Sequence, residues 1–171
     1  MVPVTNPARL SDNANYPGLL EAIQAAGHGA VCYSGKLVGW YTDDAAATQT
    51  IIDGYNPVPS AQASKIAELA AAYANAIVQP VAYMGTTFQA DLISQDTLNK
   101  TLAAITPGGA TPAGFYWVDA VNNQVAMTLA QLQGLAGAMM ANGWAAFQNL
   151  QTKKASVLAA TSVSAVNGVG W

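Results

Sequence analysis

The sequence predicts an α+β fold in which short β-hairpins pack with helices and a long helix ends the chain. Three observations lead to this prediction. Apolar residues recur at helical spacing over 61–78 and after Thr128, three strand-like segments precede tight turns, and the first 29 residues are rich in Pro, Asn and Gly. We therefore expect an extended N-terminal arm over 1–29, a hairpin and helix region over 30–128, and a helical region over 129–171.

The N-terminal arm contains three prolines, Pro3, Pro7 and Pro17, which exclude a long regular element. One short helix is expected over 18–26, where apolar side chains share a face. The rest of the arm is typical of segments that are either disordered or ordered by packing on a neighbour.

A first hairpin is expected from the strand-like segments 30–34 and 37–42, which are separated by two turn residues. A short helix should follow it. Thr42 or Asp43 is a suitable N-cap for that helix, and Gly54 is a suitable end.

The next helix is expected over 61–78, with Ser60 as its N-cap. Two prolines before it, Pro57 and Pro59, should keep the preceding segment out of the helix, because each fixes the backbone and lacks an N–H donor. Pro80 should end the helix on the other side.

A second hairpin is expected from 81–84 and 87–91, which turn at Gly85 and Thr86, and Ser94 should then cap a helix over 95–105. The following loop contains several prolines and glycines.

A third hairpin is expected from the aromatic segment 115–118 and the segment 124–127, because Asn122 and Asn123 tolerate positive φ at a turn. Thr128 should then cap the longest helix, which Asn142 and Gly143 either kink or weaken. Its apolar stripe consists of Leu129, Leu132, Leu135, Met139, Gly143, Phe147, Leu150 and Val157.

Charge is scarce in this chain: 9% of residues are charged, against roughly 25% in typical soluble domains. The net charge of -3 excludes a basic nucleic-acid binder at the level of the whole chain. So few charges on a chain with 52% hydrophobic residues indicate that much surface is buried, internally or against other chains. No run of about 18 apolar residues predicts a membrane span, and the N-terminus does not resemble a signal peptide, so we expect assembly in the cytoplasm.

Candidate catalytic and metal-binding residues are few. A single cysteine, Cys32, and a single histidine, His28, fall short of a disulfide framework or a structural zinc site. The acidic residues near expected helix starts are interpreted as capping groups; these are Asp43, Asp44, Asp91 and Asp96. No pair of carboxylates lies in an apolar motif that would favour acid–base chemistry. We expect no catalytic residue, no cofactor and no metal, and the sequence does not favour a wall- or polysaccharide-degrading enzyme.

The four tryptophans, Trp40, Trp117, Trp144 and Trp171, are interpreted chiefly as packing residues, and an aromatic platform for a sugar is the alternative. The last helix is also rich in glycine and alanine, which would let helix backbones approach closely within the chain or between chains. The interface candidates are Leu132, Gly137, Met139, Ala141, Gly143, Phe147, Leu150 and Trp171.

The order of motifs over about residues 50–171 resembles a family of short tailed-bacteriophage proteins found beside or within tail-fibre and baseplate proteins. The segments that carry the resemblance are Gly54-Tyr55-Asn56-Pro57-Val58-Pro59, 81–91, Ser94-Gln95, 115–119, 125–132 and Val169-Gly170-Trp171.

This resemblance implies a non-catalytic structural component of a phage tail, located in the virion and bound to fibre or baseplate proteins. A homo-oligomer, with a trimer as the first expectation, is implied by the threefold symmetry common in tail fibres. A fibre-assembly chaperone that is absent from the mature particle is the alternative. The low charge favours the virion component, because chaperones that remain soluble alone usually carry more charge.

Overall fold

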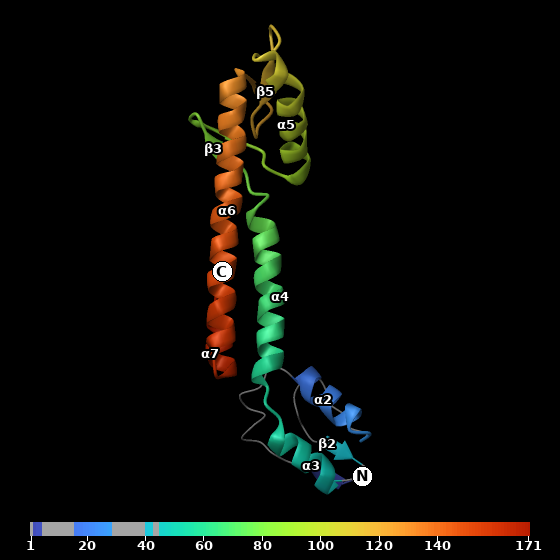
Figure 1. Ribbon diagram of the computed structural model, residues 1–171. Helices are drawn as coiled ribbons and strands as arrows, with labels where there is room; N and C mark the ends of the chain where they lie inside the picture. Colours follow the sequence, from blue (N-terminus) through green and yellow to red (C-terminus); the bar gives the residue numbers. More distant parts are fainter. Residues whose placement is uncertain (1, 5–15, 29–39, 43–44) are drawn as a thin grey trace. The chain divides into compact units, whose positions relative to one another are not determined.

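The computed structural model describes residues 2–4, 16–28, 40–42 and 45–171 and has the predicted α+β class (Figure 1). The chain divides into two compact units. The first unit consists of residues 1–68 and 153–170, and the second consists of residues 69–152 with Trp171. Helices α4 (Val58–Ala76) and α6 (Leu129–Ala159) each contribute to both units.

The first unit contains an antiparallel pair of short strands, β1 (Val2–Val4) and β2 (Trp40–Thr42). The predicted first hairpin lies largely outside the described residues, because 29–39 are not described, and so do Cys32, Asp43 and Asp44. Its described part pairs with the start of the chain, where the sequence predicts an arm. The sequence does not predict this pairing, because a local pattern identifies strand-forming residues but not a partner that is distant in sequence.

Two helices, α2 (Tyr16–Ala25) and α3 (Ala45–Gly54), complete the N-terminal part of the first unit. Both agree with the predicted helices within a few residues, and α3 ends at the predicted glycine. The buried apolar side chains of this unit come from α2, α3, the start of α4, the end of α6 and helix α7 (Val163–Asn167): Leu19, Ile23, Ile52, Ala61, Val157, Val163 and Val166.

Helix α4 begins and ends slightly earlier than predicted. The side-chain oxygen of Asn56 accepts a hydrogen bond from the N–H of Val58 at 3.1 Å, so the helix starts before Ser60. Pro59 therefore lies in the first turn, where a missing N–H costs no intrahelical bond. At the other end, the amide of Asn142 donates to the last carbonyl of the helix, that of Ala76, at 3.1 Å.

The second unit contains both remaining hairpins, β3 (Val81–Tyr83) with β4 (Thr86–Phe88), and β5 (Tyr116–Val118) with β6 (Gln124–Ala126). The β3–β4 turn is Met84–Gly85, one residue earlier than predicted. Both turn residues have positive φ, 53° and 77°, as a type I′ turn requires.

Helix α5 (Leu92–Ile105) follows the first of these hairpins and leads into a short 3₁₀ helix, η1 (Thr106–Gly108). The predicted cap, Ser94, is wrong: Asp91 is the N-cap and accepts from the N–H groups of Ile93 and Ser94. The hydroxyl of Ser94 donates to the same carboxylate at 2.7 Å. Asp91 and Ser94 are both suitable N-caps, so the sequence alone does not decide where the helix starts. The Asp91 carboxylate is chosen because a charged group accepts hydrogen bonds more strongly than a hydroxyl.

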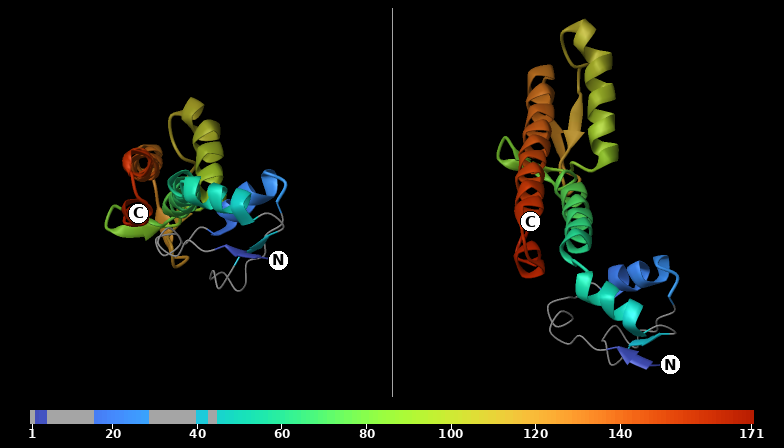
Figure 2. Two further views of the ribbon diagram at one scale, coloured as in Figure 1. Left: turned by 90° about the horizontal axis from the view of Figure 1, so that it is seen from below. Right: turned by 60° about the horizontal axis from the view of Figure 1, so that its bottom comes forward.

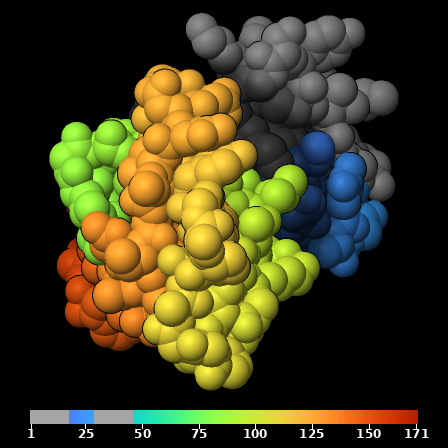
Figure 3. Space-filling view, turned by 90° about the horizontal axis from the view of Figure 1, so that it is seen from above, coloured from blue at the N-terminus to red at the C-terminus, as the bar shows by residue number. Residues whose placement is uncertain are grey.

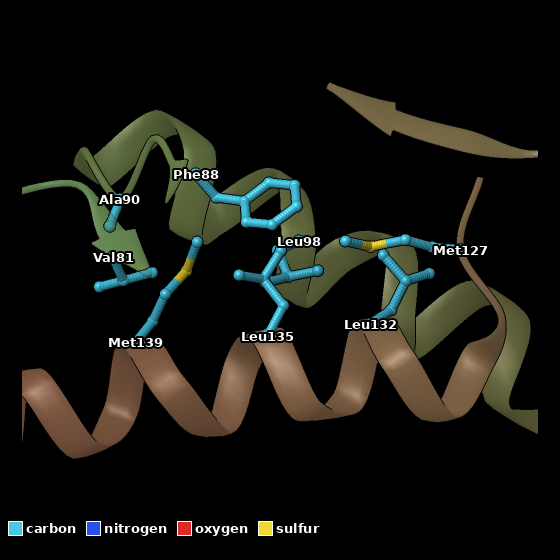
Figure 4. Packing of buried hydrophobic residues seen from close by; sticks show 8 residues of the cluster. All are labelled: Val81, Phe88, Ala90, Leu98, Met127, Leu132, Leu135 and Met139. Carbon is cyan, nitrogen blue, oxygen red and sulfur yellow. The ribbon is translucent and has the colours of Figure 1, made fainter. Parts of the chain in front are cut away.

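The core of the second unit lies between α6, α5 and the hairpins (Figure 4). Leu132, Leu135 and Met139 project from one side of α6 toward Phe88 and Leu98. Spacing of three and four residues places those three side chains on one face, as the apolar stripe predicts. The half-buried ring of Trp117 packs against this core, in agreement with its interpretation as a packing residue.

Helix α6 is continuous over 31 residues and runs through Asn142 and Gly143 without interruption. Its start is the predicted Thr128 cap. The N–H of Gln131 donates to the Thr128 hydroxyl at 3.3 Å, and the N–H of Thr128 donates to the Gln131 side chain at 2.8 Å. This reciprocal capping box fixes where the helix begins.

Candidate functional site

An exposed apolar surface on α6, which we call the α6 face, consists of Met140, Trp144 and Phe147. Met140 is 72% exposed and Trp144 is 57% exposed. Spacing of i, i+4 and i+7 places the three side chains on one side of the helix. The rings of Trp144 and Phe147 stack, with centroids 5.6 Å apart and an interplanar angle of 20°. The two aromatic rings thus form one continuous apolar surface.

The part of α6 that carries this face has no charged residue. No Asp, Glu, Lys or Arg occurs between Leu129 and Thr152, and the first charged residues of α6 are Lys153 and Lys154. A helix surface that is both uncharged and aromatic is unusual on a monomer, because large exposed apolar side chains are normally scattered among charges.

The predicted interface candidates divide into two groups in the structure. Leu132, Met139 and Leu150 are buried within the chain and belong to its own packing. Gly137 and Gly143 are half-buried, whereas Ala141, Phe147 and Trp171 are exposed. The sequence prediction missed Met140 and Trp144, because it followed the stripe of apolar residues that the chain itself buries. Plotting the remaining apolar residues on a helical projection would have identified both.

A cavity of about 510 Å³ adjoins the α6 face. Its walls come from the end of α4, from α5 and from α6, and include Tyr73, Asn99, Gly137 and Met140. The amide of Gln95, which also lines it, donates to the carbonyls of Ile77 and Ala90 and so fixes the wall. The cavity gives the α6 face a hollow beside Met140 that an apolar side chain of a partner can enter.

A second cleft, of about 440 Å³, lies between α5 and β5. Ile93 and Thr97 line it on the helix side, and Tyr116, Trp117 and Val118 line it on the strand side. Figure 2 shows the β5–β6 hairpin between α5 and the N-terminal part of α6, in agreement with Figure 1. Neither cleft lining contains a lysine, arginine or histidine.

The buried carboxylate of Asp119 organises the loop of the β5–β6 hairpin. It accepts from the backbone N–H of Asn123 at 2.8 Å and of Val121 at 2.9 Å, and from the side-chain amide of Asn123 at 3.0 Å. The Asn123 N–H contributes most to holding the pKa of Asp119 below its ordinary value of 3.8, against the opposing effect of burial. This group stays ionised as an acceptor and holds the loop.

The carboxylate of Asp91 has a similar role at the start of α5. Hydrogen bonds from the hydroxyl and N–H of Ser94, and from the N–H of Ile93, hold its pKa below 3.8. Within the described residues, no three His, Cys, Asp or Glu side chains gather where they could hold a metal ion. Among the same residues, no helix has the length and apolar character needed to span a membrane.

Comparison with known proteins identifies a family but no function. No curated protein matches the chain, and no solved structure matches it. The family model described as "Domain of unknown function (DUF4376)" matches residues 60–168, which include most of α4, both hairpins of the second unit, α5, α6 and α7. Because the match covers more than half of the chain, the protein belongs to the DUF4376 family.

Proposed function

We propose that this protein is a non-catalytic structural component of a bacteriophage tail, an adaptor that attaches to baseplate or fibre proteins through its α6 face. The observation that carries the proposal is the exposed, uncharged aromatic surface formed by Met140, Trp144 and Phe147. The tail as its setting, and the virion as its location, are supported by the resemblance of residues 50–171 to short tail-associated phage proteins.

The α6 face has the features of an interface centre. Aromatic residues dominate the energetics of protein interfaces, because each removes a large area from water. Full burial of one large apolar side chain stabilises by about 1.5–3 kcal/mol. Since Trp144 and Phe147 already stack, a partner loses less free energy in ordering them than it would with free rotamers.

The partners in this proposal are other tail proteins and further copies of the chain, and nucleic acid is not among them. A homo-oligomer would place the α6 face of one copy against a neighbour. The threefold symmetry of many tail fibres makes a trimer the first arrangement to test.

The test combines mass spectrometry of purified virions with a paired substitution. We expect the protein in particles, and we expect the double variant Trp144→Ser/Phe147→Ser to fold but to be depleted from them. The control is Leu92→Ser, which removes another exposed apolar side chain, outside both clefts. Absence of the wild-type chain from particles that need it for infectivity would support the chaperone alternative. Normal incorporation of the double variant would rule out the α6 face.

A further inference from the structure

The cleft between α5 and β5, which we call the β5 groove, differs from the α6 face in one respect: one of its walls is the edge of a β-strand. Ile93, Ser94 and Thr97 line it from α5, and the three residues of β5 line it from the hairpin. Figure 3 shows the second unit from above, where the yellow atoms at the end of α5 lie beside the orange atoms of α6.

The hydrogen bonds of the hairpin loop establish which backbone groups face the groove. The N–H of Asp119 donates to the Asn123 carbonyl at 3.0 Å, and the N–H of Asn122 donates to the Asp119 carbonyl at 3.1 Å. With Asn122 at φ 65°, this is a three-residue loop that closes on a hydrogen-bonded pair. Antiparallel strands alternate between bonded and non-bonded pairs, so the next bonded pair is Trp117 with Val125.

The backbone groups of Tyr116 and Val118 consequently point away from β6. Apart from the β5–β6 pairing itself, no backbone hydrogen bond within the described part of the chain reaches either residue. Each of the two residues offers one N–H donor and one C=O acceptor along this edge. These groups recur every two residues along β5, which is also the repeat at which an extended peptide presents its backbone groups to one side. The edge is closed beyond Val118, because the N–H of Ala120 donates to the carbonyl of Thr87 on β4 at 2.8 Å.

The lining of the groove combines exposed apolar side chains with the polar side chains of Gln89, Ser94, Thr97 and Asn122. Ile93 is 80% exposed, and Tyr116 and Val118 are also exposed. The only charged residue of the lining is Asp119, and three hydrogen bonds from its own loop occupy its carboxylate. A ligand of this groove therefore meets apolar side chains, neutral polar side chains and backbone groups, and a charged ligand finds no free counter-charge in the lining.

We propose that the β5 groove binds an extended, uncharged peptide segment of a partner protein, which adds to the hairpin as a third strand along β5. The backbone of this segment pairs with Tyr116 and Val118, and its apolar side chains contact Ile93 and the exposed side chains of β5. This site goes beyond the proposed function, because it uses another surface and does not depend on a tail setting or on the α6 face.

A neutral saccharide is the competing ligand, because Tyr116 and Trp117 offer rings and Thr97 and Asn122 offer polar groups. Two observations favour the peptide. The open strand edge presents donors and acceptors at the repeat of a polypeptide, and the exposed aliphatic side chains of Ile93 and Val118 contribute nothing to binding hydroxyl groups.

The experiment uses proline to remove one edge donor at a time. In Val118→Pro the lost N–H faces the groove, whereas in the matched control Gln124→Pro it faces the opposite, outer edge of the same hairpin. Neither N–H takes part in the β5–β6 ladder, and proline is tolerated at such positions. Circular dichroism and thermal melts of both variants establish that the hairpin and the fold are retained.

The probes are yeast-displayed random peptides of about ten residues, the upper length of ordinary strands, selected on the purified full chain. We expect enrichment of uncharged sequences with alternating apolar residues. Synthetic copies should bind wild-type protein and Gln124→Pro alike in isothermal titration calorimetry, and should bind Val118→Pro about tenfold more weakly. N-methylation of alternate amides in the peptide should abolish binding.

Three results would overturn the inference. They are the absence of any enriched peptide, equal binding of the enriched peptides to both proline variants, and binding of a neutral oligosaccharide that quenches tryptophan fluorescence while no peptide binds. Because every assay uses the purified chain, none of these results depends on whether the protein is found in virions.

Discussion

The phenol ring of Tyr83, on β3, lies against the backbone of α6 at Gly134. A methyl group at this glycine would overlap the ring, since its position is only 2.7 Å from the ring carbon that carries the hydroxyl. Tyr83 is half-buried and packs against the core of the second unit. Gly134 is therefore needed for the contact between the hairpin and the helix, whereas Gly137, one turn later, has open space around it.

The first prediction compares alanine at these two glycines. Gly134→Ala should lower the free energy of unfolding by about 1 kcal/mol or more, because overpacking against the Tyr83 ring exceeds the gain in helix propensity. Gly137→Ala should raise it by up to about 1 kcal/mol, since only the propensity gain remains. Urea unfolding measures both. Equal effects of the two substitutions would show that the Tyr83 contact is unimportant.

The second prediction concerns Gln62, whose side-chain amide donates to the carbonyls of Val157, Leu158 and Ala160 at 3.1–3.3 Å. These carbonyls lie at or just beyond the C-terminal end of α6, where few N–H donors are available along the chain. The Val157 carbonyl also accepts from the N–H of Ala160 at 3.2 Å. Gln62→Ala should lower the free energy of unfolding by about 1–2 kcal/mol. Gln133→Ala, at an exposed position of α6, is the control and should change little. Thermal melts that do not separate the two variants would contradict this role.

The third prediction is a pH dependence. Asp91 and Asp119 have pKa values below 3.8 in the folded protein, so their hydrogen bonds stabilise the fold fully above that pH. This stability is lost as the pH falls from 3.8 through the lower folded pKa values. The double variant Asp91→Asn/Asp119→Asn should be less stable at neutral pH and should lose less stability on acidification. Urea midpoints from pH 7 to pH 2.5 measure the effect, and parallel curves for the two proteins would refute it.

The fourth prediction tests self-association through the α6 face. Gly137→Leu adds a side chain into the open cavity beside Met140, so the isolated chain should tolerate it. The same side chain should block a neighbouring copy and weaken assembly by about 1–3 kcal/mol. Sedimentation velocity over a range of concentrations measures the change. Ala155→Leu, at an exposed position beyond the cavity, serves as the control for bulk alone. A wild-type chain that stays monomeric at high concentration would exclude self-association.

The fold could be predicted from the sequence wherever the signal is local. The cap at Thr128 and the positive φ of Asn122 in the β5–β6 loop are short-range patterns, and the structure confirms both. The second predicted turn residue, Asn123, instead pairs with Asp119 and closes the loop. The pairing of β1 with β2 could not be predicted, because its partners lie about 40 residues apart and no local rule connects them.

The candidate surfaces were harder to predict than the fold. The apolar stripe of α6 identifies residues that the chain buries, and Leu132 and Met139 are among them. Met140 and Trp144 are distinguished only by which side of the helix the hairpins and α5 cover, and this depends on tertiary packing. Which residues of β5 direct their backbone groups away from β6 depends on the pairing of the hairpin. A shift of one residue in the loop would exchange the bonded and the non-bonded positions.

The uncharged stretch of α6 from Leu129 to Thr152 has a consequence for the conditions under which a complex would survive. Contacts made by ion pairs weaken as salt screens them, over a Debye length of about 8 Å at physiological ionic strength. An interface centred on Trp144 and Phe147 releases no counter-ions and contains no charges to screen. Its dissociation constant should stay nearly constant from dilute buffer to sea-water salinity, and excluded salts such as sulfate should tighten it.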